Sequence, residues 1–200
     1  MADTPESKRR YRMVARAQAA EQTRARLLDS AWRHFSEQPF DAVRLADVAA
    51  EADVSLPTLH NNFGTKDVLF AAAWSSRMGV EGARREGAAT GDARASLRVL
   101  YDSYEQEGDA VLRMLAQEER IPAVKEQADS GRAWHRAWVG RTFEQALGPL
   151  GGAARERRLT ELVVATDLLV WKLLRREMGL GRRAAEGIVL EMIAALEGLE

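Results

Sequence analysis

Hydrophobic residues recur at helical spacing along most of the chain. Leu27, Ala31 and Phe35 lie four positions apart, which predicts a helix over about 23–37. Pro39 ends it, because proline disfavours helical backbone in the preceding residue. Similar spacing, interrupted mainly by glycine and proline, predicts further helices over about 44–52, 55–63, 65–80, 92–107, 109–120, 124–147, 155–178 and 182–199. Strand signals are weak, so we expect an all-α fold.

The polar positions are most informative in residues 44–63, RLADVAAEADVSLPTLHNNF, which read as two short helices joined by a turn at Asp53-Val54. Ser55 is a good N-cap, and Pro57 fits the first turn of a helix, where its missing N–H costs little. The outward face of the second helix carries Thr58, His60, Asn61 and Asn62. A polar second helix is typical of a helix-turn-helix that enters the DNA major groove, although an ordinary helical hairpin is the alternative.

A small hydrophobic core is expected to support this pair of helices. Its members are Leu27, Ala31, Phe35, Leu45, Val48, Val54, Leu59 and Phe63. After Gly64, Thr65 is expected to cap the next helix, which begins with Lys66 and continues toward Val80. Three short helices around one core would present the polar helix at the surface.

The formal net charge of the chain is only −1, so a surface that binds nucleic acid must come from positive charges gathered in one region. The N-terminal region is basic and carries Lys8, Arg9, Arg10, Arg12, Arg16, Arg24 and Arg26. A solvated tail is one interpretation of this run, but beside a helix-turn-helix it favours contact with phosphates or the minor groove. We expect residues 1–22 to form a mobile basic arm.

Several classes of function lack support in the sequence. There is no cysteine, and His34, His60 and His135 are too far apart in sequence to form a metal-ligand motif. No apolar run reaches membrane-span length, and the charged N-terminus lacks the apolar region of a signal peptide, so we expect a cytoplasmic protein without a membrane partner. Adjacent acids such as Glu118 and Glu119 face different directions on a helix and form no dyad. We therefore expect neither an enzyme nor a cofactor.

Residues 23–74 resemble the N-terminal domain of TetR-family transcription regulators. The resemblance is carried by LADVAAEADVS, PTL and NF-GTK-D-VL, in this order and spacing. Asp53 stands where the family usually has glycine, His60 where it has tyrosine, and Asn62 where histidine is frequent. Asp tolerates a left-handed backbone better than most residues, so we expect the turn to survive.

The resemblance implies which residues contact DNA. Arg44, Thr58, His60 and Lys66 are the candidates for phosphate contact, and Leu56, Pro57 and Asn61 are those for base-edge contact or groove fit, with Ser55 completing the set. Asn61 is the preferred specificity residue, because asparagine can read adenine through two hydrogen bonds.

The resemblance also implies a plan of a DNA-binding domain over 23–70 followed by a helical effector-binding and dimerisation domain over 71–200. The run 162–174, LVVATDLLVWKLL, is apolar over more than one stripe, which favours a dimer surface over an ordinary core helix. The candidate dimer residues are Leu162, Leu169, Leu173, Ile188, Met192, Ile193 and Leu196.

Aromatic and methionine residues of the second half suggest an apolar ligand pocket, but a filled core explains them equally well. The candidates are Trp74, Met78, Tyr101, Tyr104, Met114, Trp134 and Trp138. His135 points elsewhere and is interpreted as a surface or satisfied histidine.

Two functions remain open. The first is a homodimeric transcriptional regulator that binds a palindromic double-stranded operator, represses by occupancy and is released by a small apolar or amphipathic ligand. The second is a DNA-binding regulator without a small effector, controlled by a protein partner or by its abundance.

Overall fold

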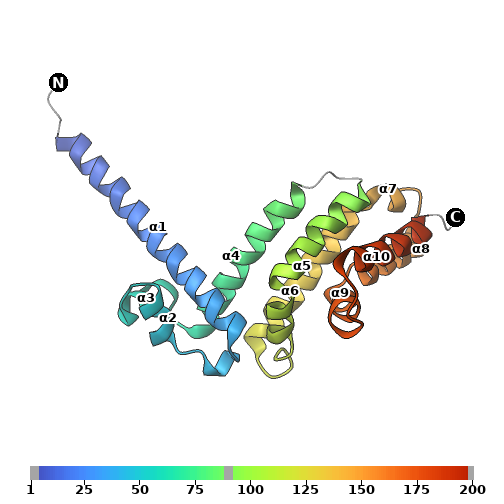
Figure 1. Cartoon of the computed structure of the whole chain (residues 1–200). Coiled ribbons are helices and arrows are strands. Elements are labelled where there is room, and N and C mark those ends of the chain that lie inside the picture. Colours follow the sequence, from blue (N-terminus) through green and yellow to red (C-terminus); the bar gives the residue numbers. More distant parts are fainter. Residues whose placement is uncertain (1–4, 88–91, 198–200) are drawn as a thin grey trace. The chain divides into compact units, whose positions relative to one another are not determined.

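The computed structural model describes residues 5–87 and 92–197, and these residues contain helices and no strand, which confirms the all-α fold (Figure 1). The first part of the chain contains α1 (Pro5–Glu37), the short η1 (Phe40–Ala42), α2 (Leu45–Glu51), α3 (Leu56–Phe63) and α4 (Lys66–Glu86). The second contains α5 (Ala93–Leu115), α6 (Pro122–Thr142), α7 (Glu144–Leu147), α8 (Gly152–Ala165), α9 (Leu168–Lys172), η2 (Leu173–Glu177) and α10 (Arg182–Glu197).

The chain divides into two compact units, Met1–Arg77 and Met78–Glu200, with the division inside α4. We call them the N-terminal and C-terminal units. The expected boundary between residues 70 and 71 falls in the same helix. Within the described helices, none combines the length and apolarity needed to cross a membrane.

The N-terminal unit is built around the predicted three-helix core. Leu27, Ala31, Phe35, Val48, Leu59 and Phe63 are buried, and Leu45 and Val54 are partly buried. Phe40 and Phe70 extend this core by packing on Phe35, with ring centroids 5.4 and 5.0 Å away. These ring contacts join α1, η1 and the start of α4, while α2 contacts both α1 and α3.

The first helix is longer than predicted. It begins at Pro5 rather than near Thr23, so residues 5–22 of the expected arm are helical. The physical reason is that residues 6–38 contain no glycine or proline and are rich in arginine, alanine, glutamine and glutamate, which favour helix. Residues 1–4 of the expected arm lie outside the described residues.

The C-terminal unit packs α5, α6, α8, α9 and α10 around one buried cluster. Trp171 is fully buried in this cluster, and Leu97, Tyr101, Leu162 and Val189 belong to it as well. Figure 1 shows α10 lying along α5 and α8, and contacts join it to both helices.

Three predicted helix limits in this unit are wrong. One helix, α5, spans Gly108 and Asp109, where two helices were expected. The single helix expected over 155–178 is divided at Thr166-Asp167, because the Asp167 side chain accepts from Leu169 N at 2.8 Å and caps α9. The helix expected over 124–147 begins at Pro122 and is divided after Thr142.

The predicted breaks at Gly148–Gly152 and Gly179–Gly181 are confirmed, since they separate α7 from α8 and η2 from α10. Of the break expected at Gly87–Gly91, residues 88–91 lie outside the described residues, as does the last part of the helix expected to reach Leu199.

Candidate nucleic-acid interface

The turn between α2 and α3 depends on the backbone of Asp53. Its φ of 55° places it in the left-handed region, and Val54 N donates to Ala49 O at 3.0 Å to close the turn. This confirms the expectation that Asp tolerates the conformation for which glycine is the usual residue. The turn therefore keeps the geometry of a helix-turn-helix.

Helix α3 begins and ends where the sequence predicted. The Ser55 hydroxyl accepts from Thr58 N at 3.3 Å, and Pro57 occupies the first turn. At the other end Gly64 leaves the helix with a φ of 69°. Thr65 then caps α4, because its hydroxyl accepts from Val68 N at 3.3 Å.

One face of α3 is buried and the other is open. Leu59 and Phe63 pack inward, whereas Leu56, Pro57 and Asn61 are exposed. Arg24 of α1 lies over the Phe63 ring at 4.6 Å and fixes the end of the helix. Because α3 contains no acidic residue, its open face can approach a polyanion without direct repulsion from its own side chains.

Two of the outward polar side chains bond to their own helix. Asn62 donates to Thr58 O at 2.8 Å, and His60 Nδ1 lies 2.9 Å from Gly64 O. The carbonyl can only accept, so Nδ1 carries the proton. His60 Nε2 is then an acceptor in the neutral ring and can donate to a phosphate only when the ring is charged.

Lys66 lies at the start of α4, and its ammonium is held over η1. It donates to Asp41 O at 3.2 Å and lies 4.9 Å from the centre of the Phe40 ring. Partial burial lowers the pKa of Lys66, although Asp41 and Asp67 oppose the shift. This anchorage was not predicted, because it depends on the 25 residues that separate Lys66 from Asp41 in sequence.

Arg44 is the remaining phosphate candidate and precedes α2. Its side chain is largely exposed. The guanidinium forms a long ion pair with Asp47, at 3.8 Å, and is therefore only weakly fixed in place. Arg44, Thr58, His60 and Lys66 thus all belong to the short segment formed by α2, α3 and the start of α4.

Comparison with protein families gives a match over residues 27–73 to the bacterial regulatory proteins of the tetR family. The match covers the helix-turn-helix and its supporting core. Residues 27–73 form a tetR-family domain. This domain is the DNA-binding part of a transcriptional regulator, with α3 in the place of the recognition helix.

Solved structures agree with the fold of this chain. A candidate transcriptional regulator from Pseudomonas aeruginosa PAO1 has a TM-score of 0.68 and 19% identity, covering 90% of this chain and 92% of that one. A transcriptional regulator from Rhodococcus sp. RHA1 has a TM-score of 0.67 and 18% identity, and the match covers 86% of this chain and 95% of that regulator. At such identities the likeness shows the fold alone. A comparison with curated proteins found no match.

The aromatic residues suggested for a ligand pocket lie mostly inside packed structure. Trp74 is buried in the N-terminal unit, while Tyr101, Tyr104, Met114 and Trp138 are buried in the C-terminal unit. Met78 and Trp134 are partly buried. None of the seven lines the hollow between α5 and α10 that is described below.

A buried polar group that the sequence analysis missed lies among these aromatic residues. Arg85 of α4 donates to Glu81 at 2.5 Å and lies over the rings of Trp134 and Trp138, at 4.7 and 5.1 Å. The spacing of Glu81 and Arg85, four positions apart on a helix, is the signal that could have found the pair. The pair was missed because the helix was predicted to end near Val80, before either residue.

His135 completes this group and is satisfied on both ring nitrogens. Nδ1 accepts from Arg85 at 3.3 Å, so Nε2 carries the proton and donates to Thr166 Oγ1 at 3.1 Å. Thr166 in turn donates to Leu162 O at 2.8 Å. Burial, helped by the Arg85 charge, lowers the pKa of His135 to about 3.

The candidate dimer residues divide into exposed and buried sets. Leu169, Leu173, Ile188 and Met192 are exposed, and Leu196 is partly buried. Two of the candidates are corrected. Leu162 and Ile193 are almost wholly buried in the core of their own chain, so they have no surface to offer a second copy.

Proposed function

We propose that this TetR-family protein is a homodimeric repressor that reads a palindromic operator with α3. The observation that supports the proposal best is the exposed face of α3, which carries no acidic side chain. The opposite face of the helix is packed into the core through Leu59 and Phe63. Asn61 lies on that face and can recognise a base edge, while Arg44, Thr58, His60 and Lys66 contact phosphates beside it. A dimer on a promoter represses by occupying the site of the polymerase. Because the operator is DNA inside the cell, we propose that the protein acts in the cytoplasm.

An exposed apolar surface supports dimerisation. We call Leu169, Leu173, Ile188 and Met192 the apolar face, to which Val164 and Met178 add exposed side chains nearby in sequence. Leu169 alone is 61% exposed. Large apolar residues gathered at a surface mark an interaction site, and a two-fold dimer matches the two half-sites of a palindrome.

We further propose that a small apolar or amphipathic ligand releases the dimer from DNA. The aromatic residues of the C-terminal unit supply suitable side chains. Their close packing favours the second candidate function, a regulator without such a ligand, because a closed core must open before anything enters it.

The experiment that tests the proposal is selection of bound duplexes from random DNA with the purified full chain. Enrichment of a two-fold symmetric sequence is the expected result, with binding that weakens steeply as salt increases. Failure to enrich any sequence would contradict operator recognition. Loss of binding when candidate inducers are added distinguishes a ligand-released repressor from the second candidate.

A further inference from the structure

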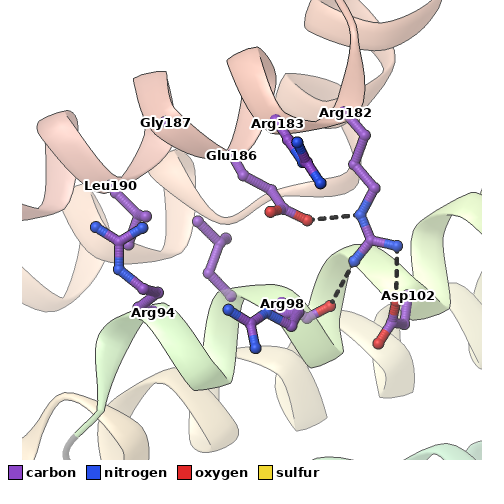
Figure 2. Close-up of a pocket in the computed structure, with 9 residues that line it drawn as sticks. Arg94, Arg98, Asp102, Arg182, Arg183, Glu186, Gly187 and Leu190 are labelled. Carbon is purple, nitrogen blue, oxygen red and sulfur yellow. Dashed lines mark hydrogen bonds and ion pairs between the residues drawn. The ribbon is translucent and has the colours of Figure 1, made fainter.

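A hollow lies between α5 and α10 within the C-terminal unit. Its volume is about 570 Å³, which is within the usual size range of small-molecule sites. Figure 2 shows its two walls, with Arg94 and Arg98 on α5 and Arg182 and Arg183 at the start of α10. The hollow therefore has arginine side chains from both helices.

The acids in the hollow are already engaged. Asp102 accepts from Arg182 Nη1 at 2.7 Å, and Glu186 accepts from Arg182 Nε at 2.6 Å. Arg182 also donates to Arg98 O at 3.2 Å. Although burial alone would lower the pKa of Arg182, these two ion pairs raise it, so the residue is charged and fixed in place.

The other three arginines have no such partner. Across residues 5–87 and 92–197, no carboxylate or carbonyl is bonded to the side chain of Arg94, Arg98 or Arg183. With four guanidinium groups and two carboxylates, the lining carries an excess of two positive charges. Unpaired like charges around one hollow repel each other, and a bound anion would remove that repulsion.

The floor of the hollow is apolar, and Gly187 in its lining has no side chain to fill the space. Leu97 is buried beneath it, and Leu190 is partly buried on the α10 side. A Cβ placed on Gly187 would meet nothing within 4 Å. Glycine is unfavourable inside a helix, so its presence here keeps open a space that an alanine would narrow.

We propose that this hollow binds a small organic anion. Arg94, Arg98 and Arg183 hold its carboxylate or phosphate groups, since the guanidinium fork matches the geometry of both. A short carbon skeleton lies over Leu97 and Leu190. This site goes beyond the proposed function, because it lies outside the aromatic residues and its occupation requires no DNA.

The test is calorimetric titration of the full chain with citrate and, separately, with inorganic phosphate, at constant ionic strength. We expect citrate to bind with a Kd below about 1 mM and to bind more tightly than phosphate, which lacks a carbon skeleton. The double variant Arg98→Gln/Arg183→Gln is expected to lose at least about tenfold in citrate affinity. Arg141→Gln/Arg157→Gln, which removes the same two positive charges from exposed sites on α6 and α8, is the matched control and should bind as the unchanged protein does.

A second variant tests the space rather than the charge. Gly187→Leu fills the hollow from α10 and should abolish citrate binding, while Gly79→Leu makes the same change at an open position on α4 and should not. Circular dichroism confirms that each variant is folded. Absence of binding by the unchanged protein to both anions, or equal citrate affinity in the double variant and its control, overturns the proposal. Neither result would affect operator selection, so the two proposals fail separately.

Discussion

At the scale of single residues, Lys66 joins the fold to the proposed DNA contact. Its ammonium lies over Phe40 and donates to Asp41 O, so it is held at the start of α4 before any DNA is bound. We expect Lys66→Ala to weaken binding to the operator and to unrelated duplexes alike. The slope of log affinity against log salt should fall by about 1, as for the loss of one phosphate contact.

Lys125→Ala is the control for this prediction. Lys125 is an exposed lysine of α6 that pairs with Asp129, and it belongs to the C-terminal unit. Fluorescence anisotropy over a series of salt concentrations measures both slopes. An unchanged affinity and slope in Lys66→Ala would show that Lys66 does not contact phosphate.

His135 makes stability depend on pH. The folded chain holds the ring neutral with a pKa of about 3, whereas the unfolded chain has the ordinary value of about 6.5. The unfolded state therefore binds the proton between these two values. The stabilisation is complete above about pH 6.5 and is lost as the pH falls toward 3, at up to about 1.4 kcal/mol per pH unit.

Urea unfolding of the unchanged protein and of His135→Gln at pH 7 and pH 5 measures this effect. Glutamine can accept from Arg85 and donate to Thr166 but does not titrate, so the variant keeps the contacts and loses the proton. We expect the unchanged protein to lose about 2 kcal/mol more between pH 7 and pH 5 than the variant does. Equal losses would contradict a neutral, buried His135.

At the scale of elements, α5 and α9 approach so closely that only glycine fits between them. A Cβ on Gly108 would lie 2.7 Å from the Trp171 ring, and that ring is fixed because Trp171 Nε1 donates to Glu105 at 3.0 Å. We expect Gly108→Ala to destabilise the fold by about 1–3 kcal/mol through overpacking. The free energy of unfolding in urea checks this.

Gly79→Ala provides the comparison, because a Cβ at that helical position meets nothing within 4 Å. Replacing an open helical glycine by alanine should stabilise the fold by about 0.5–1 kcal/mol. If both variants shift stability in the same direction, the close contact of Gly108 with Trp171 does not limit the packing of α5 on α9.

The sequence predicted those elements whose ends are encoded locally. Ser55 and Gly64 delimit α3 through their own hydrogen bond and backbone angle, and Asp53 supports the turn in the same way. The separate helix expected to begin at residue 109 is wrong, because a helix continues through a polar residue when its face is packed. The start of α1 at Pro5 was missed, although proline fits the first turn of a helix, because the basic run that follows was interpreted as a mobile arm.

The candidate site was predictable to a similar extent. The family motif predicts the segment that faces DNA, and the structure adds that His60 and Asn62 are engaged with their own helix. The anchorage of Lys66 and the hollow between α5 and α10 were not predictable, since each joins residues that only the tertiary fold brings together. Burial likewise excludes Leu162 and Ile193 from the proposed dimer surface.

At the scale of the whole molecule, the proposed dimer depends on the apolar face. Leu169→Arg or Met192→Arg places a charge on this face, and an unpaired charge buried in an interface is costly. We expect either variant to shift the protein from dimer to monomer in light scattering and to reduce operator affinity at least about tenfold. Val14→Arg, at an exposed position on α1, is the control and should leave the dimer intact.

The central proposal is that α3 reads a specific DNA sequence. Anisotropy titration of the full chain and of Asn61→Ala, each against the selected palindrome and an unrelated duplex at the same salt, tests this claim most directly. We predict that the unchanged protein prefers the palindrome by at least about 10³ and that Asn61→Ala loses about 1–3 kcal/mol of this preference. Equal affinity of the unchanged protein for both duplexes would contradict the account.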